Sequence, residues 1–101
     1  MTVHVIADNA SKIAALRDVI EQRHLVTSEM LDGAEIKRKG IGAVVVAVDI
    51  ANVDNIAALK AASVKLACIG KRIFLIERKG RLSMVQAYAL GATDVLANPV
   101  N

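Results

Sequence analysis

Short apolar runs alternate with longer amphipathic stretches along the whole chain. Each apolar run is five to seven residues long and is bounded by polar residues, glycine or proline. Runs of this kind predict β-strands, and five can be identified. They span residues 3–7, 25–30, 42–48, 72–77 and 93–97.

The stretches between the runs predict helices. Ile13, Leu16 and Ile20 recur at helical spacing, with charged residues on the opposite side, which predicts a helix to about residue 23. Residues 53–70 predict a second helix, which Asp54 or Asn55 would cap and Gly70 would end.

Two further connections complete the pattern. Residues 82–90 predict a helix that ends at Gly91, whereas residues 31–40 predict only a brief helix or turn. The run at 42–48 is apolar at every position, which is typical of a central strand with helices on both faces. Regular alternation of strands and helices favours a doubly wound parallel sheet, an α/β fold.

Composition limits the classes of protein that fit this pattern. A chain of 101 residues predicts one domain, and 54% hydrophobic residues with only 2% aromatics predict an aliphatic core. No apolar run approaches the length of a membrane span, and the start does not resemble a signal peptide, so a soluble, cytoplasmic protein is expected. The lone Cys68 excludes an internal disulfide and is expected to be buried.

Charge and catalytic chemistry give little support to an enzyme or a nucleic-acid-binding protein. The net charge of +3 comes from 13 basic and 10 acidic residues, and no aromatics are interleaved with the basic clusters. His4 lies within a predicted strand and is expected to be structural. No nucleophile and base can be assembled from the strand ends, so no catalytic residues, no direct nucleic-acid binding and no membrane contact are predicted.

In a doubly wound sheet, functional residues gather at the carboxyl ends of the strands. These positions hold Ala7-Asp8, Ala47 to Asp49, Glu77 and Asn98-Pro99. Together with the alternation, the acidic start ADN and the ending GATDVLANPV (residues 91–100) resemble the receiver domains of bacterial two-component response regulators, the CheY-like fold. The resemblance covers nearly the whole chain and implies a five-stranded parallel sheet of order 2-1-3-4-5.

The resemblance also implies a chemistry, which this chain lacks at several positions. Receivers accept a phosphoryl group on an aspartate after the third strand, next to Mg²⁺ held by an acid pair, a Thr or Ser, and a Lys. The acid pair aligns with Ala7 and Asp8, the Thr or Ser with Glu77, and the Lys before Pro99 with Asn98. One metal acid, the hydroxyl donor and the cation are therefore absent.

The acceptor position can be placed in two ways. Asp49 makes the following loop two residues shorter than the family pattern D-x-x-x-P-x-x-D-G, whereas Ala47 fits the pattern without a gap. We favour Ala47, which would leave the domain with no nucleophile. The resemblance then implies a degenerate, phosphorylation-independent pseudo-receiver that acts in signal transduction as a protein-interaction or dimerisation module.

The same residues also allow a weak metal site and two alternative functions. Asp8, Asp49 and Glu77 are the candidates for a weak divalent-cation site, but no cofactor is expected, and Asp8 is interpreted mainly as a helix cap. One alternative is a working receiver that is phosphorylated on Asp49. Another is a STAS-like binding module, which residues 44–76 distantly resemble, although the acceptor Ser of that family is missing.

No predicted helix follows the fifth strand, where receivers carry a final helix. We therefore expect residues 1–101 to be the receiver-like, N-terminal part of a longer regulatory protein. The missing helix would leave an apolar patch over the first, third and fifth strands. A protein partner, the chain's own output domain or a second copy is expected to cover it, which favours a homo-oligomer.

Overall fold

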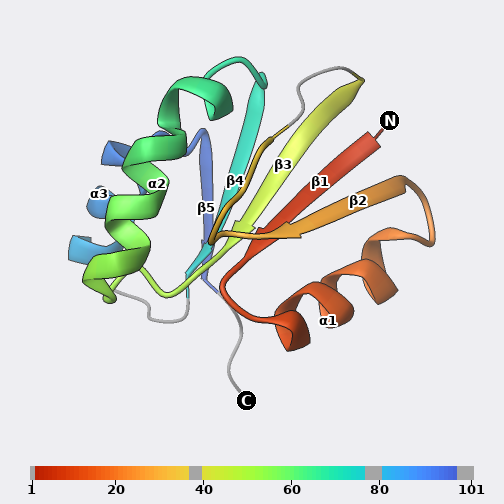
Figure 1. Ribbon diagram of the computed structural model, residues 1–101, viewed down its shortest axis with the longest axis horizontal. Coiled ribbons are helices and arrows are strands. Elements are labelled where there is room, and N and C mark those ends of the chain that lie inside the picture. The colour runs from red at the N-terminus through yellow and green to blue at the C-terminus, as the bar shows by residue number, and fades with distance from the viewer. Residues whose placement is uncertain (1, 37–39, 77–80, 98–101) are drawn as a thin grey trace.

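The computed structural model describes residues 2–36, 40–76 and 81–97. Within these ranges, five strands form a single parallel sheet of order β2-β1-β3-β4-β5 (Figure 1). The strands are β1 (Thr2–Ala7), β2 (Leu25–Met30), β3 (Ile41–Ala47), β4 (Lys71–Ile76) and β5 (Asp94–Ala97). The predicted fold class and strand order are confirmed, and the order places a switch point between β1 and β3.

Three helices lie on the two faces of the described sheet. They are α1 (Ala10–Ile20), α2 (Val53–Leu66) and α3 (Arg81–Ala89). Helix α1 lies beside β1 and β2, while α2 and α3 gather on the side of β4 and β5 (Figure 1). None of these helices combines the length and apolarity that crossing a membrane requires.

The main core lies between the sheet and the helices α2 and α3. Strand residues Ile6, Val44 and Phe74 are at most 1% exposed and pack with Leu59 and Leu66 of α2. Phe74 is the largest fully buried side chain. The aliphatic core predicted from composition is therefore present, with one aromatic ring at its centre.

The opposite face is covered less evenly. Val5 and Val45 are buried there although α1 itself contains no buried residue, whereas Leu96 of β5 is 54% exposed. The predicted bare patch over three strands is wrong for β1 and β3. On this face the exposure lies toward β5, the edge farthest from α1.

The helix boundaries correct several sequence predictions. The side chain of Asn9, not Asp8, caps α1 by accepting the Lys12 N–H at 2.9 Å. Asn52, not Asp54 or Asn55, caps α2, which ends at Leu66 rather than Gly70. An asparagine just before the first turn reaches the unpaired N–H groups of the helix, so the residues after it fall inside the helix.

The early end of α2 also corrects the prediction for Cys68. This residue follows the helix, and its thiol is exposed rather than buried. Its apolar neighbour Ile69 takes the buried position instead, at 1% exposed.

The connection after β2 forms a turn, not a helix, over its described residues 31–36. Leu31 and Ile36 are buried at its two ends, at 5% and 3% exposed. Ile36 adopts a left-handed backbone with φ of 46°, an uncommon conformation for a β-branched residue. Buried side chains therefore anchor this short connection to the sheet.

Candidate functional site: the crevice at the switch point

Two alanines lie at the switch point, the region between the carboxyl ends of β1 and β3 that is called the crevice in doubly wound sheets. Ala7 ends β1, Ala47 ends β3, and the two residues pair directly in the parallel register. They are 0% and 6% exposed. Methyl groups therefore occupy this edge of the sheet.

Asp8, the next residue after β1, lies among hydrogen-bond donors. Its Oδ2 accepts the Asp49 backbone N–H at 2.9 Å and the Asn55 side-chain amide at 3.2 Å. Asn55 also donates to the Asp49 carbonyl at 3.0 Å. Asp8 thereby ties the end of β1 to the loop between β3 and α2.

The second oxygen of Asp8 faces helix α1. Lys12 Nζ lies 2.8 Å from Oδ1, with side-chain exposures of 23% for Lys12 and 17% for Asp8. The contact is an ion pair rather than an aligned hydrogen bond, since no donor in the described ranges meets Oδ1 in hydrogen-bond geometry. The carboxylate is therefore held from one side by the β3–α2 loop and faced from the other by a cation.

The local sequence explains how these groups meet. The Asn9 cap starts α1 at Ala10, so Lys12 lies in the first turn, four residues after Asp8. The Asn52 cap starts α2 so that Asn55 lies in its first turn, within reach of Asp8. Two asparagine caps thus orient the lysine and the amide toward one carboxylate.

The surroundings of Asp8 shift its acidity. Burial by itself would raise the pKa of Asp8, but the Lys12 ammonium and the Asp49 N–H outweigh it, so the pKa lies below its ordinary value of 3.8. Donors and an opposite charge favour the ionised form of a carboxyl group. Asp8 is therefore a carboxylate at neutral pH.

Asp49, the alternative acceptor candidate, makes its hydrogen bonds through its backbone N–H and one side-chain oxygen. Its backbone N–H points to Asp8, and its side-chain Oδ1 accepts the Ala51 N–H at 3.0 Å. This turn occupies one oxygen of Asp49 within its own loop. Asp49 also lies two residues beyond Ala47, the last residue of β3.

The part of the crevice that the structure describes does not fit the Mg²⁺ that receiver chemistry implies. Mg²⁺ requires several oxygen lone pairs in octahedral geometry. Here two N–H donors meet Asp8 Oδ2, and an ammonium lies against Oδ1. Across the described ranges, no group of three or more His, Cys, Asp or Glu residues could hold a metal.

Several predicted pocket residues cannot be compared with this geometry. Glu77, Asn98 and Pro99 lie outside the described residues, so their assigned positions remain predictions. Of the remaining candidates, the structure brings together Ala7, Asp8, Ala47 and the backbone of Asp49. The Asp8–Asp49 contact is a hydrogen bond and not a pair of metal-ligating carboxylates.

The roles of Lys12 and Asn55 are not among the sequence predictions. For Lys12 a signal was available, because an acid and a lysine four residues apart across a helix start lie near each other. For Asn55 no comparable signal exists, since its partner Asp8 is 47 residues away in the chain.

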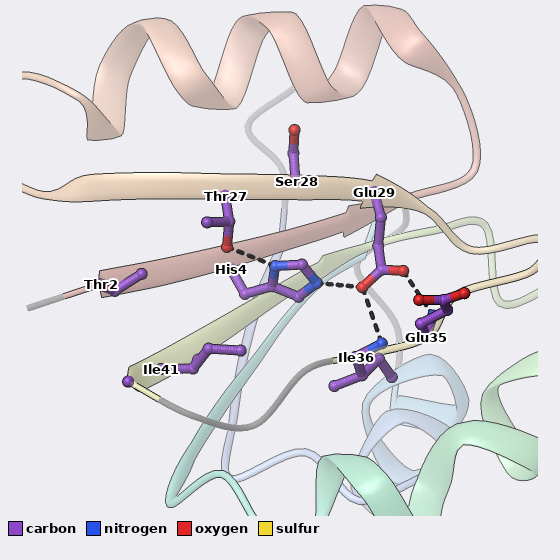
Figure 2. A pocket seen from close by; sticks show the side chains of 9 residues that line it. Thr2, His4, Thr27, Ser28, Glu29, Glu35, Ile36 and Ile41 are labelled. Atoms are coloured by element: carbon purple, nitrogen blue, oxygen red, sulfur yellow. Dashed lines mark hydrogen bonds and ion pairs between the residues drawn. The ribbon is translucent and has the colours of Figure 1, made fainter.

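A second cluster of polar side chains lies on the sheet face opposite to α1. It lines a hollow of about 440 Å³. In Figure 2, His4 points from β1 toward Thr27 and Glu29 of β2. Its Nδ1 lies 2.7 Å from Thr27 Oγ1, and its Nε2 lies 2.5 Å from Glu29 Oε2.

Glu29 also holds the connection that follows β2. Its Oε1 accepts the Glu35 N–H at 2.7 Å, and its Oε2 accepts the Ile36 N–H at 3.1 Å (Figure 2). Burial raises the pKa of Glu29, but the Glu35 N–H and His4 together lower it below its ordinary value of 4.5. These groups satisfy one another, and His4, which is 6% exposed, has the structural role expected of it.

A third feature is the outer surface of α3. Four apolar side chains of this nine-residue helix are between 42% and 85% exposed. They are Leu82, Met84, Val85 and Tyr88. Contiguous exposed apolar groups of this kind mark contact surfaces more often than isolated ones do.

Comparison with known proteins agrees with the fold. No protein-family model and no curated protein matches the sequence. Among solved structures, a putative pilus assembly-related protein from Burkholderia pseudomallei matches with a TM-score of 0.74 and 17% identity, over 100% of this chain and 80% of that one. The Vibrio cholerae chemotaxis protein CheY4 matches with a TM-score of 0.73 and 16% identity, over 99% of this chain and 88% of that one.

A third match is a B. pseudomallei response regulator that contains a phosphorylated aspartic acid and a calcium ion. Its TM-score is 0.68 and its identity 21%, over 99% of this chain and 61% of that one. The architecture is thus a doubly wound α/β sheet with its switch point between β1 and β3. More specifically, the chain has the CheY-like fold of response regulator receiver domains.

Proposed function

We propose that this chain is a phosphorylation-independent pseudo-receiver, which regulates an output domain or a partner protein through protein contacts in the cytoplasm. The observation that carries the proposal is the pairing of Ala7 with Ala47 at the carboxyl edge of the sheet. Phosphoryl transfer to a receiver needs a carboxylate nucleophile and cations that neutralise the transferred charge. Two buried methyl groups supply neither.

The surroundings of the alanines support the same function. The Asp8 carboxylate is already engaged by Asp49, Asn55 and Lys12. An enzymatic role of its own finds no support among the described residues, because no nucleophile lies beside a base in this crevice. The scaffold then serves as a binding module.

The exposed surface of α3 is the proposed contact region. Leu82, Val85 and Tyr88 are spaced three residues apart and are 85%, 60% and 48% exposed. Tyrosine and methionine are enriched in protein interfaces, and burial of such residues stabilises association. We expect a second copy of the chain or an output domain to bind to this surface.

Phosphorylation tests the first part of the proposal. The chain is incubated with acetyl phosphate and Mg²⁺, and its intact mass is measured beside a phosphorylatable receiver treated in parallel. The expected result is no phosphoryl adduct. A stoichiometric adduct that Asp49→Asn abolishes would instead establish a working receiver and contradict the proposal.

Light scattering tests the second part. Val85→Glu places a charge on the exposed surface of α3 and is expected to shift the chain toward monomer without loss of the folded state. Val53→Glu, at a residue of α2 that is 77% exposed, is the matched control. A strict monomer at high concentration, or equal effects of the two variants, would contradict an oligomer through α3.

A further inference from the structure

The crevice contains its own cation. Lys12 Nζ lies 2.8 Å from Asp8 Oδ1, and both side chains are largely shielded from solvent, at 23% and 17% exposed. Shielding strengthens such a pair relative to one on an open surface. The receiver resemblance aligns Asp8 with the retained residue of the acid pair, so the lysine lies against the carboxylate that would bind the metal.

We propose that Lys12 is an internal countercharge that takes the place of a divalent cation at Asp8 and holds the crevice in a single state. This inference rests on the pseudo-receiver proposal, because it concerns the same crevice and explains how its remaining charge is regulated. It differs from an incidental surface ion pair in three ways that the geometry supports.

The Asp8 carboxylate is oriented by contacts that do not involve the lysine. Asp49 and Asn55 both donate to Oδ2, at 2.9 and 3.2 Å, which turns Oδ1 toward α1. The Asn55 amide also donates a hydrogen bond to the Asp49 carbonyl at 3.0 Å, which joins the two residues that donate to Asp8. Asp8 is therefore presented to α1 in one fixed orientation.

The lysine is oriented as well. The Asn9 side chain accepts the Lys12 backbone N–H at 2.9 Å, which places Lys12 in the first turn of α1. A group attached to the same chain competes at a high effective concentration against a free ion. A dissolved cation must therefore displace a tethered ammonium from Oδ1.

A divalent cation would also meet unfavourable neighbours. The N–H groups of Asp49 and Asn55 point their positive ends at Oδ2, and the ammonium lies beside Oδ1. Ala7 and Ala47 offer no second carboxylate to offset this repulsion. Among the described residues, the surroundings of Asp8 are therefore complementary to an ammonium rather than to a metal ion.

The consequence for regulation is a link between α1 and the β3–α2 loop that does not depend on an external ion. In receivers that use a metal and a phosphoryl group, the charge in the crevice changes with the signal. In this chain Lys12 supplies the same charge at all times.

Replacement of Lys12 tests the inference through cation binding. Wild type, Lys12→Met, Lys12→Gln and Lys12→Arg are labelled with ¹⁵N and titrated with MnCl₂, whose paramagnetism broadens amide resonances near a bound ion. Lys60→Met removes an exposed lysine from α2 and is the matched control. Thermal unfolding with and without MgCl₂ gives a second readout.

We expect no saturable broadening at Asp8 or Asp49 in wild type, Lys12→Arg or Lys60→Met. In Lys12→Met and Lys12→Gln, the affinity for Mn²⁺ at Asp8 should rise by about tenfold or more. A neighbouring charge shifts the pKa of a carboxyl group by about one unit or more, which corresponds to a factor of about ten. Mg²⁺ should raise the unfolding temperature of these two variants only.

A wild-type chain that binds Mn²⁺ at Asp8 as tightly as Lys12→Met would overturn the inference. So would unchanged binding in both Lys12→Met and Lys12→Gln; if Lys12→Met does not fold, Lys12→Gln decides alone. The outcome is independent of phosphoryl labelling. A chain that is labelled by acetyl phosphate contradicts the pseudo-receiver, whereas a chain that is unlabelled but binds the ion contradicts only the role of Lys12.

Discussion

Asp8 and Glu29 are two shielded carboxylates that the chain holds in related ways, in two regions of the sheet. Asp8 accepts one backbone N–H group and Glu29 accepts two, in each case from a loop that follows a strand, and each carboxylate has one ionisable side-chain partner. The partner of Asp8 is Lys12 of α1, and the partner of Glu29 is His4 of β1.

The partners differ in what they bring to the carboxylate. An ammonium brings a net positive charge on a flexible stem, whereas an imidazole can donate a hydrogen bond in either protonation state. His4 is fixed within β1 and is also bonded to Thr27. Glu29 then holds the connection that places Ile36, with its φ of 46°, in the core. The Glu29 cluster therefore holds a connection of the fold, while the Asp8 contacts join α1 to the loop between β3 and α2.

Glu29→Ala should give the largest loss of stability, because it removes the carboxylate at the centre of the Glu29 cluster. It removes the acceptor of two backbone N–H groups and of His4, and the connection loses the contact that holds Ile36. The free energy of unfolding should fall by about 3 kcal/mol or more in urea denaturation. Glu21→Ala, which removes an exposed ion pair of α1, should cost less than about 0.5 kcal/mol. Equal losses in the two variants would refute the structural role of Glu29.

Acid should weaken both regions, since both carboxyl groups have a lowered pKa in the folded chain. Their contribution to stability is fully present above the ordinary values of 3.8 for Asp8 and 4.5 for Glu29. It is lost as the pH falls through the lower, folded-state values, because the unfolded chain then binds more protons. Urea midpoints measured between neutral and acidic pH should decrease in this range. Glu29→Gln should flatten the profile, and an unchanged profile in that variant would contradict the assignment.

Two substitutions of Asn55 distinguish the effect of charge from the effect of hydrogen bonding in the crevice. Asn55→Ala should lower the free energy of unfolding by about 1 kcal/mol, since it removes two hydrogen bonds of a partly shielded amide. Asn55→Asp should cost more, because it places a second carboxylate beside Asp8 Oδ2. Denaturation of both variants gives the order. An aspartate that is tolerated better than alanine would mean that the Asp8 crevice does accept a further anion.

The sequence predicts the arrangement of the strands better than the contacts between side chains. Continuous apolar runs identify β3 and β4, and the alternation of elements predicts the parallel order. Strand β2 gives a weak signal because Thr27 and Glu29 are polar and face the His4 hollow instead of an apolar core. A local pattern cannot anticipate that burial.

The functional edge shows the same limit. Ala7 and Ala47 can be placed from strand ends and the receiver resemblance, and the register pairs them. The sequence favours Asp8 as a cap because acids often precede helices. In the structure Asn9 caps α1, and Asp8 instead contacts Lys12 and Asn55. Which of two adjacent polar residues caps a helix depends on backbone angles that sequence spacing does not provide.

The most direct test of the account is an NMR titration of the wild-type chain with Mg²⁺ and beryllofluoride, the mimic of a phosphoryl group. We predict that the amide resonances of Asp8, Ala47 and Asp49 do not move, because the proposed pseudo-receiver has Ala47 at the acceptor position and Lys12 already lies against the Asp8 carboxylate. Saturable shifts at these residues that spread to α3 would show a working receiver and contradict the account.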